Sequence, residues 1–244
     1  MKTILLTGDS RGVGHCISKE LLSKGYRVIG ISRTVTEDVE RLTEKYGIEN
    51  YVHINYDLLD VNGIKHLYKK TLRPLTDENG IYGFVNNAAM AYDDIISNLN
   101  YEPLDKMYKV NVFSPMMIIK YVLRDMLLNK TQGSIVHISS ISAHTGYKGL
   151  AMYASTKGAI EVFSKNTARE WGALGIRSNV VCPGFMDTEM SATLSKEQKN
   201  RIFNRNSMKK PVEVEAVAST VLFLLEQSGK GITGDILHVD NGTI

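Results

Sequence analysis

A glycine-rich turn follows the first apolar segment of the chain and constrains the fold more than any other feature. Ile4 to Leu6 is a short apolar run that predicts a β-strand, and Gly14 to Lys24 has the apolar spacing of a helix. Between them lie Gly8, Gly12 and Gly14, spaced Gly-x-x-x-Gly-x-Gly. Glycine at such a turn lets the backbone and the helix N-terminus approach a pyrophosphate. The turn therefore predicts a dinucleotide site, and a glycine-rich turn without a ligand is the alternative.

Strand and helix patterns alternate along the rest of the chain. Apolar runs predict further strands at 27–32, 51–56, 83–85, 134–139, 178–182 and 235–239. Parallel strands need crossover connections of this kind, and no linker rich in proline, glycine or serine interrupts the pattern. We expect an α/β fold in which residues 1–244 form a single domain. Its core is a doubly wound, Rossmann-like parallel sheet with helices on both faces and ligands beyond the carboxyl ends of the strands.

Charge and cysteine content exclude several classes of function. The net charge is +3 and no block of five basic residues occurs, which argues against a nucleic-acid partner. Cys16 and Cys182 lie far apart, without a partner at metal or redox spacing, so we expect no metal and no disulfide. The first apolar run is too short for a signal sequence, and no segment approaches the length of a membrane span. We therefore expect a cytoplasmic protein without membrane partners.

The end of the second strand bears on the choice of cofactor. An acidic residue there accepts a hydrogen bond from the ribose 2′-hydroxyl of NAD, whereas arginine accommodates the 2′-phosphate of NADP. Ser32 and Arg33 stand at this position, and Arg11 in the glycine-rich turn can reach the same phosphate. The pattern favours NADP(H). The alternative is that both arginines are solvated surface groups.

A tyrosine and a lysine four residues apart, Tyr153 and Lys157, follow the strand that ends at Ser139 and Ser140. Residues four apart share one face of a helix. A free phenol has a pKa near ~10, and an ammonium group one turn away favours the phenolate and lowers that pKa. With Ser140 holding a carbonyl or alcohol oxygen, Tyr153 can act as a general acid or base. The alternative for Tyr153 alone is a helix tyrosine packed against the sheet.

Together these motifs resemble the short-chain dehydrogenase/reductase family, most closely its 3-oxoacyl-(acyl-carrier-protein) reductases, and the resemblance extends from Thr7 to Gly242. It implies a catalytic tetrad of Asn111, Ser140, Tyr153 and Lys157, in which the asparagine holds a water that relays protons to the lysine. It implies cofactor contacts along the glycine-rich turn and the strand ends. These positions are Gly8, Ser10, Arg11, Gly12, Val13, Gly14, Ser32, Arg33, Asp57, Leu58, Asn87, Ala88, Ala89, Tyr153, Lys157, Pro183, Gly184, Met186 and Thr188.

The resemblance also implies an activity: NADPH-dependent reduction of a 3-oxoacyl thioester, carried by acyl carrier protein or coenzyme A, in fatty acid biosynthesis. The polar segment 185–211 would cover the substrate. Thr131 and Leu174 replace two arginines that receive the carrier protein in the family. A sugar, polyol or other small secondary alcohol therefore stays open as the substrate. A non-catalytic NADP-binding regulator is a further alternative, against which the intact tetrad argues.

Two further expectations concern the C-terminal turn and the assembly. Asn241 stands in a turn where the family has glycine, and asparagine tolerates left-handed backbone. The segment 111–128 is apolar around most of its circumference, and such a helix must be buried on more than one side. The family's homotetramer would bury it, and other elements of its own chain are the alternative.

Overall fold

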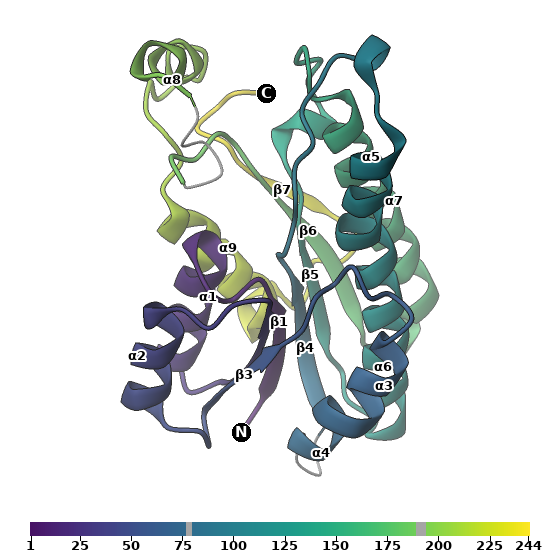
Figure 1. The fold of residues 1–244 in the computed structure, drawn as a ribbon. Helices are drawn as coiled ribbons and strands as arrows, with labels where there is room; N and C mark the ends of the chain where they lie inside the picture. The colour runs from purple at the N-terminus through teal and green to yellow at the C-terminus, as the bar shows by residue number, and fades with distance from the viewer. Residues whose placement is uncertain (77–79, 189–193) are drawn as a thin grey trace.

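The computed structural model describes residues 1–76, 80–188 and 194–244. Seven parallel strands form one sheet in the order β3-β2-β1-β4-β5-β6-β7 (Figure 1). Each strand lies within two residues of its predicted bounds. The strands are β1 (Thr3–Thr7), β2 (Arg27–Ser32), β3 (Tyr51–Asn55), β4 (Ile81–Asn86), β5 (Ser134–Ile138), β6 (Arg177–Pro183) and β7 (Ile236–Val239). The strand order reverses between β1 and β4, so the expected doubly wound sheet is confirmed. Sheets of this kind bind their ligands beyond the carboxyl ends of the strands at such a switch point.

Helices cover both faces of the sheet (Figure 1). One face carries α1 (Gly12–Ser23), α2 (Glu37–Tyr46) and α9 (Val214–Leu225). The other face carries α3 (Ile64–Leu67), α4 (Arg73–Leu75), α5 (Tyr101–Tyr108), α6 (Ser114–Leu128) and α7 (Ala151–Trp171). Helix α8 (Lys196–Phe203) lies near the carboxyl-end side of the sheet, in the upper left of Figure 1.

Irregular helical turns connect several of these elements. The π-helical turn η1 (Tyr68–Leu72) joins α3 to α4, and the π-helical turn η3 (Lys109–Phe113) joins α5 to α6. Short 3-10 turns are η2 (Ile96–Asn98), η4 (Ile141–Ala143), η5 (Gly172–Leu174) and η7 (Gln227–Gly229). The helix expected at 111–128 is therefore divided, because Asn111 belongs to η3 and the regular helix begins at Ser114.

Each face of the sheet has its own hydrophobic core. Ile4 and Leu6 of β1 pack toward α1 and α9, while Leu5 packs into the core beneath α6. All three side chains are fully buried. A strand covered on both faces has to be apolar without alternation, which is why β1 reads as a continuous apolar run. In the described part of the chain, no helix is both long and apolar enough to cross a membrane.

Candidate active site at the carboxyl ends of the strands

The glycine-rich turn between β1 and α1 can accept only glycine at two positions. Gly8 has a φ of +73°, and a Cβ there would lie 2.8 Å from Asn87 Nδ2. A Cβ on Gly14 would lie 1.8 Å from the carbonyl oxygen of Gly8. The turn is therefore tight, and it leads directly into the N-terminus of α1 at Gly12. Backbone N–H groups and a helix N-terminus fit a pyrophosphate, so the residues present suit a dinucleotide cofactor.

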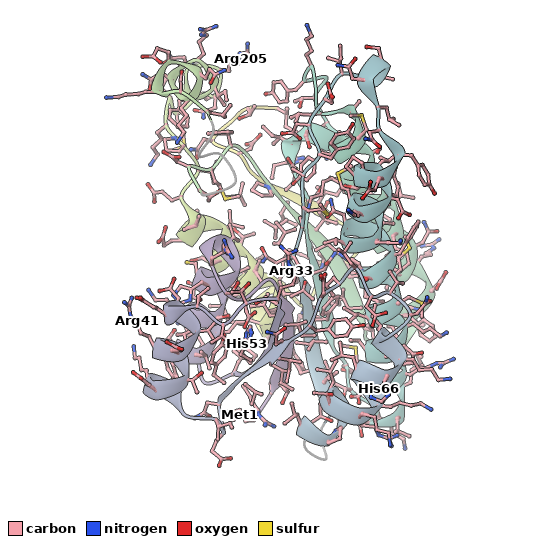
Figure 2. The ribbon with its side chains drawn as sticks, viewed as in Figure 1. Met1, Arg33, Arg41, His53, His66 and Arg205 are labelled. Atoms are coloured by element: carbon pink, nitrogen blue, oxygen red, sulfur yellow. The ribbon has the colours of Figure 1, made fainter. Side chains whose placement is uncertain are left out.

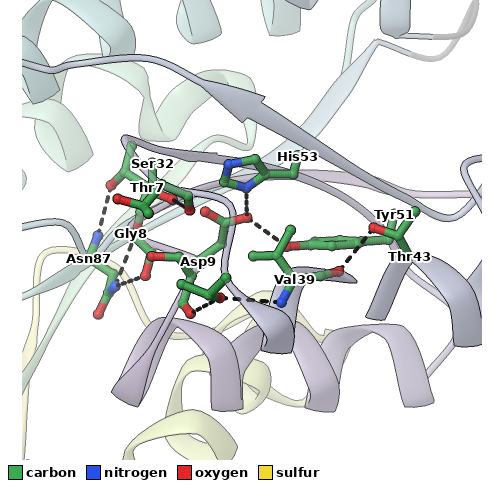
Figure 3. A network of polar contacts seen from close by, with 12 residues as sticks. Thr7, Gly8, Asp9, Ser32, Val39, Thr43, Tyr51, His53 and Asn87 are labelled. Carbon is green, nitrogen blue, oxygen red and sulfur yellow. Dashed lines mark hydrogen bonds and ion pairs between the residues drawn. The ribbon is translucent and has the colours of Figure 1, made fainter. Parts of the chain in front are cut away.

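Asn87 fastens the turn to the neighbouring strand. Its Nδ2 donates to the carbonyl oxygens of Thr7 and Gly8, both at 3.1 Å. The Thr7 hydroxyl accepts from the backbone N–H groups of Asn87 and Ala88, also at 3.1 Å (Figure 3). These four hydrogen bonds lock the ends of β1 and β4 together. The backbone at the switch point between β1 and β4 is therefore held in one position.

The buried carboxylate of Asp9, which the sequence analysis did not single out, holds the glycine-rich turn against the sheet. Asp9 is fully buried, and its Oδ2 accepts from the Tyr51 hydroxyl at 2.7 Å and contacts His53 Nδ1 at 2.8 Å (Figure 3). Gly30 of β2 makes room for it, because a Cβ there would lie 1.8 Å from Asp9 Oδ2. An acidic residue inside the turn, opposite a glycine in the middle of a strand, is the sequence signal that could have revealed this contact. The network ties the turn to β2 and β3.

The end of β2 presents the groups proposed to select the cofactor. Ser32 is half-buried, and Arg33 and Arg11 are exposed. Arg33 directly follows β2, whereas Arg41 lies on the outer side of α2 (Figure 2). The turn is held in register with α2 because the hydroxyl of Thr36, the N-cap of α2, donates to the Ser10 carbonyl at 2.8 Å.

Asp57 and Leu58, two of the predicted cofactor contacts, follow the end of β3 and differ in their burial. Asp57 is exposed, and its Oδ1 accepts from the backbone N–H of Leu59 at 2.9 Å. Leu58 is buried in the core beneath α6, and its carbonyl accepts from the Ser114 hydroxyl. The position of Leu58 is therefore fixed by α6, and Asp57 is held by a turn of its own backbone.

The predicted proton-handling residues converge at the end of β5. Ser140 caps η4, where its Oγ accepts from the backbone N–H of Ser142 at 3.2 Å. Tyr153 and Lys157 lie on successive turns of α7, with Lys157 Nζ 5.5 Å from the centroid of the Tyr153 ring. Lys157 is 5% exposed, and its Nζ donates to the Ile138 carbonyl of β5 at 2.8 Å. Helix α7 is thus fastened to the strand that carries the serine.

Asn111 is held inside the π-helical turn η3. Its side-chain Oδ1 accepts from the Met90 N–H at 2.9 Å, and its Nδ2 donates to the Met90 carbonyl at 2.9 Å and to Thr156 Oγ1 at 3.1 Å. The side chain therefore joins η3 to α7 and to the segment after β4. The residue that would donate to the Asn111 backbone carbonyl in a regular helix is Pro115, which has no N–H. Such π-helical turns are frequent at functional sites.

The structure corrects the expected direction of the Tyr153 pKa. Burial raises the pKa of the Tyr153 phenol, and the Asp93 carboxylate and Cys182 raise it further. Burial also lowers the pKa of the neighbouring Lys157, to about 8. The sequence showed the charge of the lysine but not the burial of both groups, and Asp93 was missed altogether. The raised pKa means that the Tyr153 phenol is protonated at neutral pH.

The segment after β6 packs against the C-terminal turn of the chain. Gly184 packs against the backbone of Asp240, since a Cβ there would lie 2.8 Å from Asp240 Cα, and its N–H donates to Val239 O at 2.9 Å. Asn241 adopts left-handed backbone with a φ of +57°, which confirms the expected C-terminal turn. Asn241 Nδ2 donates to the carbonyls of Lys210 and Pro211, at 3.1 and 3.0 Å. The C-terminal turn thus holds the far end of segment 185–211.

Segment 185–211 contains a helix with a defined beginning. Ser195 and Gln198 form a reciprocal capping box at the start of α8. Lys199 of this helix pairs with Asp187, which ties α8 to the segment that leaves β6. Residues 189–193 lie outside the described residues. The remaining predicted positions all border the same end of the sheet: Gly12 and Val13 in the first turn of α1, Ala89 after β4, and Met186 and Thr188 after β6.

Comparisons with known proteins agree with this geometry. Residues 8–243 match the family model described as enoyl-(acyl carrier protein) reductase. The chain is 31% identical to a 3-oxoacyl-(acyl-carrier-protein) reductase of Buchnera aphidicola over 99% of its own length and 96% of the relative. It is 35% identical to carbonyl reductase (NADPH) 2 of Sus scrofa, over 98% and 94%. A solved 4-hydroxyisoleucine dehydrogenase complexed with NADH superposes with a TM-score of 0.92 at 22% identity, over 100% and 98%, which shows the same fold.

Proposed function

The chain belongs to the short-chain dehydrogenase/reductase family, and from that premise we propose that it is an NADPH-dependent reductase of 3-oxoacyl thioesters. It is an oxidoreductase that acts on CH–OH and C=O groups with a nicotinamide cofactor. The proposal adds the choice of NADPH, the thioester substrate and the roles of individual residues. A role in fatty acid biosynthesis and a cytoplasmic location are parts of the same proposal.

The observation that carries the proposal is the fastening of Tyr153, Lys157 and Asn111 around the end of β5. Lys157 is bonded to β5, and Asn111 is bonded to α7 through Thr156, so the helix that carries Tyr153 is fastened to the strand that precedes Ser140. Fixed groups of this kind can hold a reacting carbonyl in place.

The chemistry follows from these positions. When bound, NADPH supplies a hydride to the carbonyl carbon. Ser140 Oγ donates a hydrogen bond to the carbonyl oxygen, and Tyr153 donates its proton to the same oxygen as general acid. A raised pKa suits a group that must be protonated before the reaction. In our proposal Lys157 returns a proton to the phenol afterwards, and a water held by the Asn111 backbone carbonyl passes a proton from solvent to the lysine.

Selection of NADPH is proposed to rest on Arg11 and Arg33. Both flank the position that a 2′-phosphate would occupy beyond Ser32, and a guanidinium forms strong charge-assisted hydrogen bonds to phosphate. The Sus scrofa relative is a carbonyl reductase (NADPH), which supports the same cofactor. The structural neighbour bound to NADH shows that the fold itself does not decide between the two cofactors.

The relatives and the basic residues of the chain bear on the class of substrate. The family model and the Buchnera relative both concern acyl-carrier-protein reductases. Lys148, Lys209 and Lys210 follow the carboxyl ends of β5 and β6 and supply positive charge that could receive an acidic carrier. Lys130 precedes β5 and lies at the opposite end of the sheet. Thr131 and Leu174 stand where the family has arginines, and this observation favours a second candidate function. That function is the same reduction on a sugar, polyol or other small carbonyl compound that needs no carrier.

The assembly is proposed to be a homotetramer. Several apolar side chains of η3, α6 and α7 are exposed, and α6 and α7 cover the same face of the sheet (Figure 1). They are Phe113 at 45%, Leu127 at 38%, Leu128 at 66% and Val162 at 61% exposure. An exposed apolar surface formed by two neighbouring helical elements is typical of an interface between subunits.

The test is the oxidation of NADPH by the purified protein with acetoacetyl-CoA, in parallel with NADH and with small sugar and polyol ketones. Turnover of the thioester with NADPH supports the leading proposal, and Tyr153→Phe should abolish it. Turnover of the small ketones alone would favour the second candidate. Binding of NADPH without turnover of any carbonyl compound would contradict both.

A further inference from the structure

Three potential metal ligands meet at the carboxyl ends of β5, β6 and β7. Cys182 and His238 are register partners on neighbouring strands, so their side chains leave the sheet on the same face. His144 follows η4, the turn after β5. One ligand atom from each residue lies within 4.8 Å of the other two. The residues are 38 and 56 positions apart along the chain, which is why no spacing in the sequence indicated them.

The surroundings of the cluster are those of a metal site. His144 Nε2 contacts Glu161 Oε1 at 3.0 Å, and Ser139 donates to the same carboxylate oxygen. A carboxylate on one nitrogen of an imidazole is the usual partner of a metal-bound histidine, because it orients the ring and leaves the other nitrogen for the metal. The two imidazole rings lie edge to face with centroids 5.0 Å apart.

The three proposed ligands differ in their exposure to solvent. Cys182 is fully buried, whereas His144 and His238 are exposed. An ion can therefore approach from solvent on the histidine side. Ligand atoms of a tetrahedral zinc site are about 3.5 Å apart, from bond lengths of about 2.0–2.3 Å. The ligand atoms lie within 4.8 Å of one another, so they have to approach by at most about 1 Å, which rotation of the two exposed histidine side chains permits.

We propose that His144, Cys182 and His238 bind a zinc-like transition metal ion, with Glu161 as the positioning residue of His144. One thiolate and two imidazoles are the donors that Zn²⁺ prefers, and a fourth position would remain for water. The proposed metal site borders the proposed active site, because Cys182 immediately precedes Pro183 and Gly184, and it does not depend on the identity of the substrate.

Electrostatics link this site to the proposed proton-handling groups. Burial raises the pKa of the Cys182 thiol to about 12, with Glu161 and Asp240 adding to the effect and Lys157 opposing it. Coordination requires the thiolate, so binding must release the thiol proton. Cys182 also acts electrostatically on both Tyr153 and Lys157. Because Cys182 is electrostatically linked to both groups, we expect Zn²⁺ bound to its sulfur to inhibit turnover reversibly.

Calorimetric titration of the full chain with Zn²⁺ tests the site without reference to activity. We expect one ion per chain, with release of the Cys182 thiol proton on binding. His238→Asn and Cys182→Ala should each weaken binding by more than ~10-fold, because each removes a ligand. Glu161→Gln should weaken it by ~10- to 100-fold, as loss of an outer partner does. Cys16→Ser and His66→Asn, at the other cysteine and at an exposed histidine, should bind as the wild type does.

Cobalt spectroscopy identifies the ligands directly. Co²⁺ in this site should show the intense visible bands of tetrahedral coordination and a thiolate-to-metal charge-transfer band. The charge-transfer band should be absent in Cys182→Ala and present in Cys16→Ser. Equal Zn²⁺ affinity in wild type and His238→Asn, or a Co²⁺ spectrum without a Cys182-dependent thiolate band, would overturn the proposal. Since His238→Asn alters an exposed side chain, misfolding would not obscure the result.

Discussion

Lys157 Nζ donates a 2.8 Å hydrogen bond to the Ile138 carbonyl, which places a cationic group where only 5% of the residue is exposed. One backbone carbonyl is a small substitute for water, so burial lowers the pKa of Lys157 from 10.5 to about 8. This lysine therefore opposes folding when it is charged, in addition to any part that it plays in catalysis. The destabilising effect of the charged lysine therefore depends on pH.

The first prediction is that stability gained with rising pH depends on Lys157. Between pH 8 and 10.5 the unfolded chain holds a proton on this lysine that the folded chain has lost, so the free energy of unfolding rises with pH. At ~1.4 kcal/mol per pKa unit, the total gain is about 3 kcal/mol. Denaturant unfolding at several pH values should show this increment in wild type and not in Lys157→Met. Parallel profiles for the two proteins would contradict the pKa direction.

A second prediction concerns Asp93, whose carboxylate raises the pKa of Tyr153 after the larger effect of burial. The oxidation direction requires the phenolate, so its rate should rise with pH. Asp93→Asn removes one of the opposing negative charges, and the alkaline rise should move to lower pH. Asp94→Asn is the matched control, because it makes the same charge change one residue away. Identical shifts in both variants would show a nonspecific effect of surface charge.

The third prediction separates the Asp9 network from the rest of the turn. Gly30→Ala introduces a Cβ into the space of the Asp9 carboxylate and should lower the melting temperature and weaken NADPH binding. Asp9→Ala should also destabilise the protein, since it leaves the Tyr51 hydroxyl without its partner, a cost of ~1–3 kcal/mol.

The double variant tests the contact itself. Removing the carboxylate removes the two shortest contacts of the new Cβ and leaves only the 2.9 Å approach to the Cβ of residue 9, so Gly30→Ala should cost less in the Asp9→Ala background, by ~0.5–3 kcal/mol. Thermal unfolding measures the stability term, and fluorescence titration with NADPH measures the effect on the turn. Strict additivity of the two substitutions would mean that they do not act through this contact.

Local patterns allowed the sheet and most of the candidate site to be predicted from the sequence. The turn at Gly8 and the Tyr153–Lys157 pair each depend on residues close together in the chain, so spacing carries the information. Asp9 and Tyr51 are 42 residues apart and meet only after β3 has joined the sheet, so no spacing records their contact. The direction of the Tyr153 pKa was wrong for a related reason, because burial belongs to the folded molecule.

The fourth prediction tests the cofactor assignment. Arg33→Asp should swing preference from NADPH toward NADH, because a carboxylate repels the 2′-phosphate and can accept from a 2′-hydroxyl. Arg33→Ala should raise the KM for NADPH by ~10- to 100-fold, consistent with a lost charge-assisted hydrogen bond of ~1.5–3 kcal/mol. Arg41→Ala is the control, since Arg41 pairs with Glu37 on the outer side of α2. An unchanged ratio of NADPH to NADH turnover in Arg33→Asp would refute the role of this arginine.

The last prediction is that one charge on α7 breaks the assembly. Val162 is 61% exposed on the outer side of a helix whose other side packs against the sheet, so Val162→Glu should leave the fold intact. If copies of the chain pack on this surface, the carboxylate would be buried without a partner, and the complex should dissociate. Light scattering should give a tetramer for wild type and a smaller species for Val162→Glu. Ile48→Glu, 68% exposed in the connection between α2 and β3, should behave as wild type. A wild-type monomer at micromolar concentration would contradict the proposed tetramer and would leave the exposed side chains of η3, α6 and α7 without a subunit to cover them.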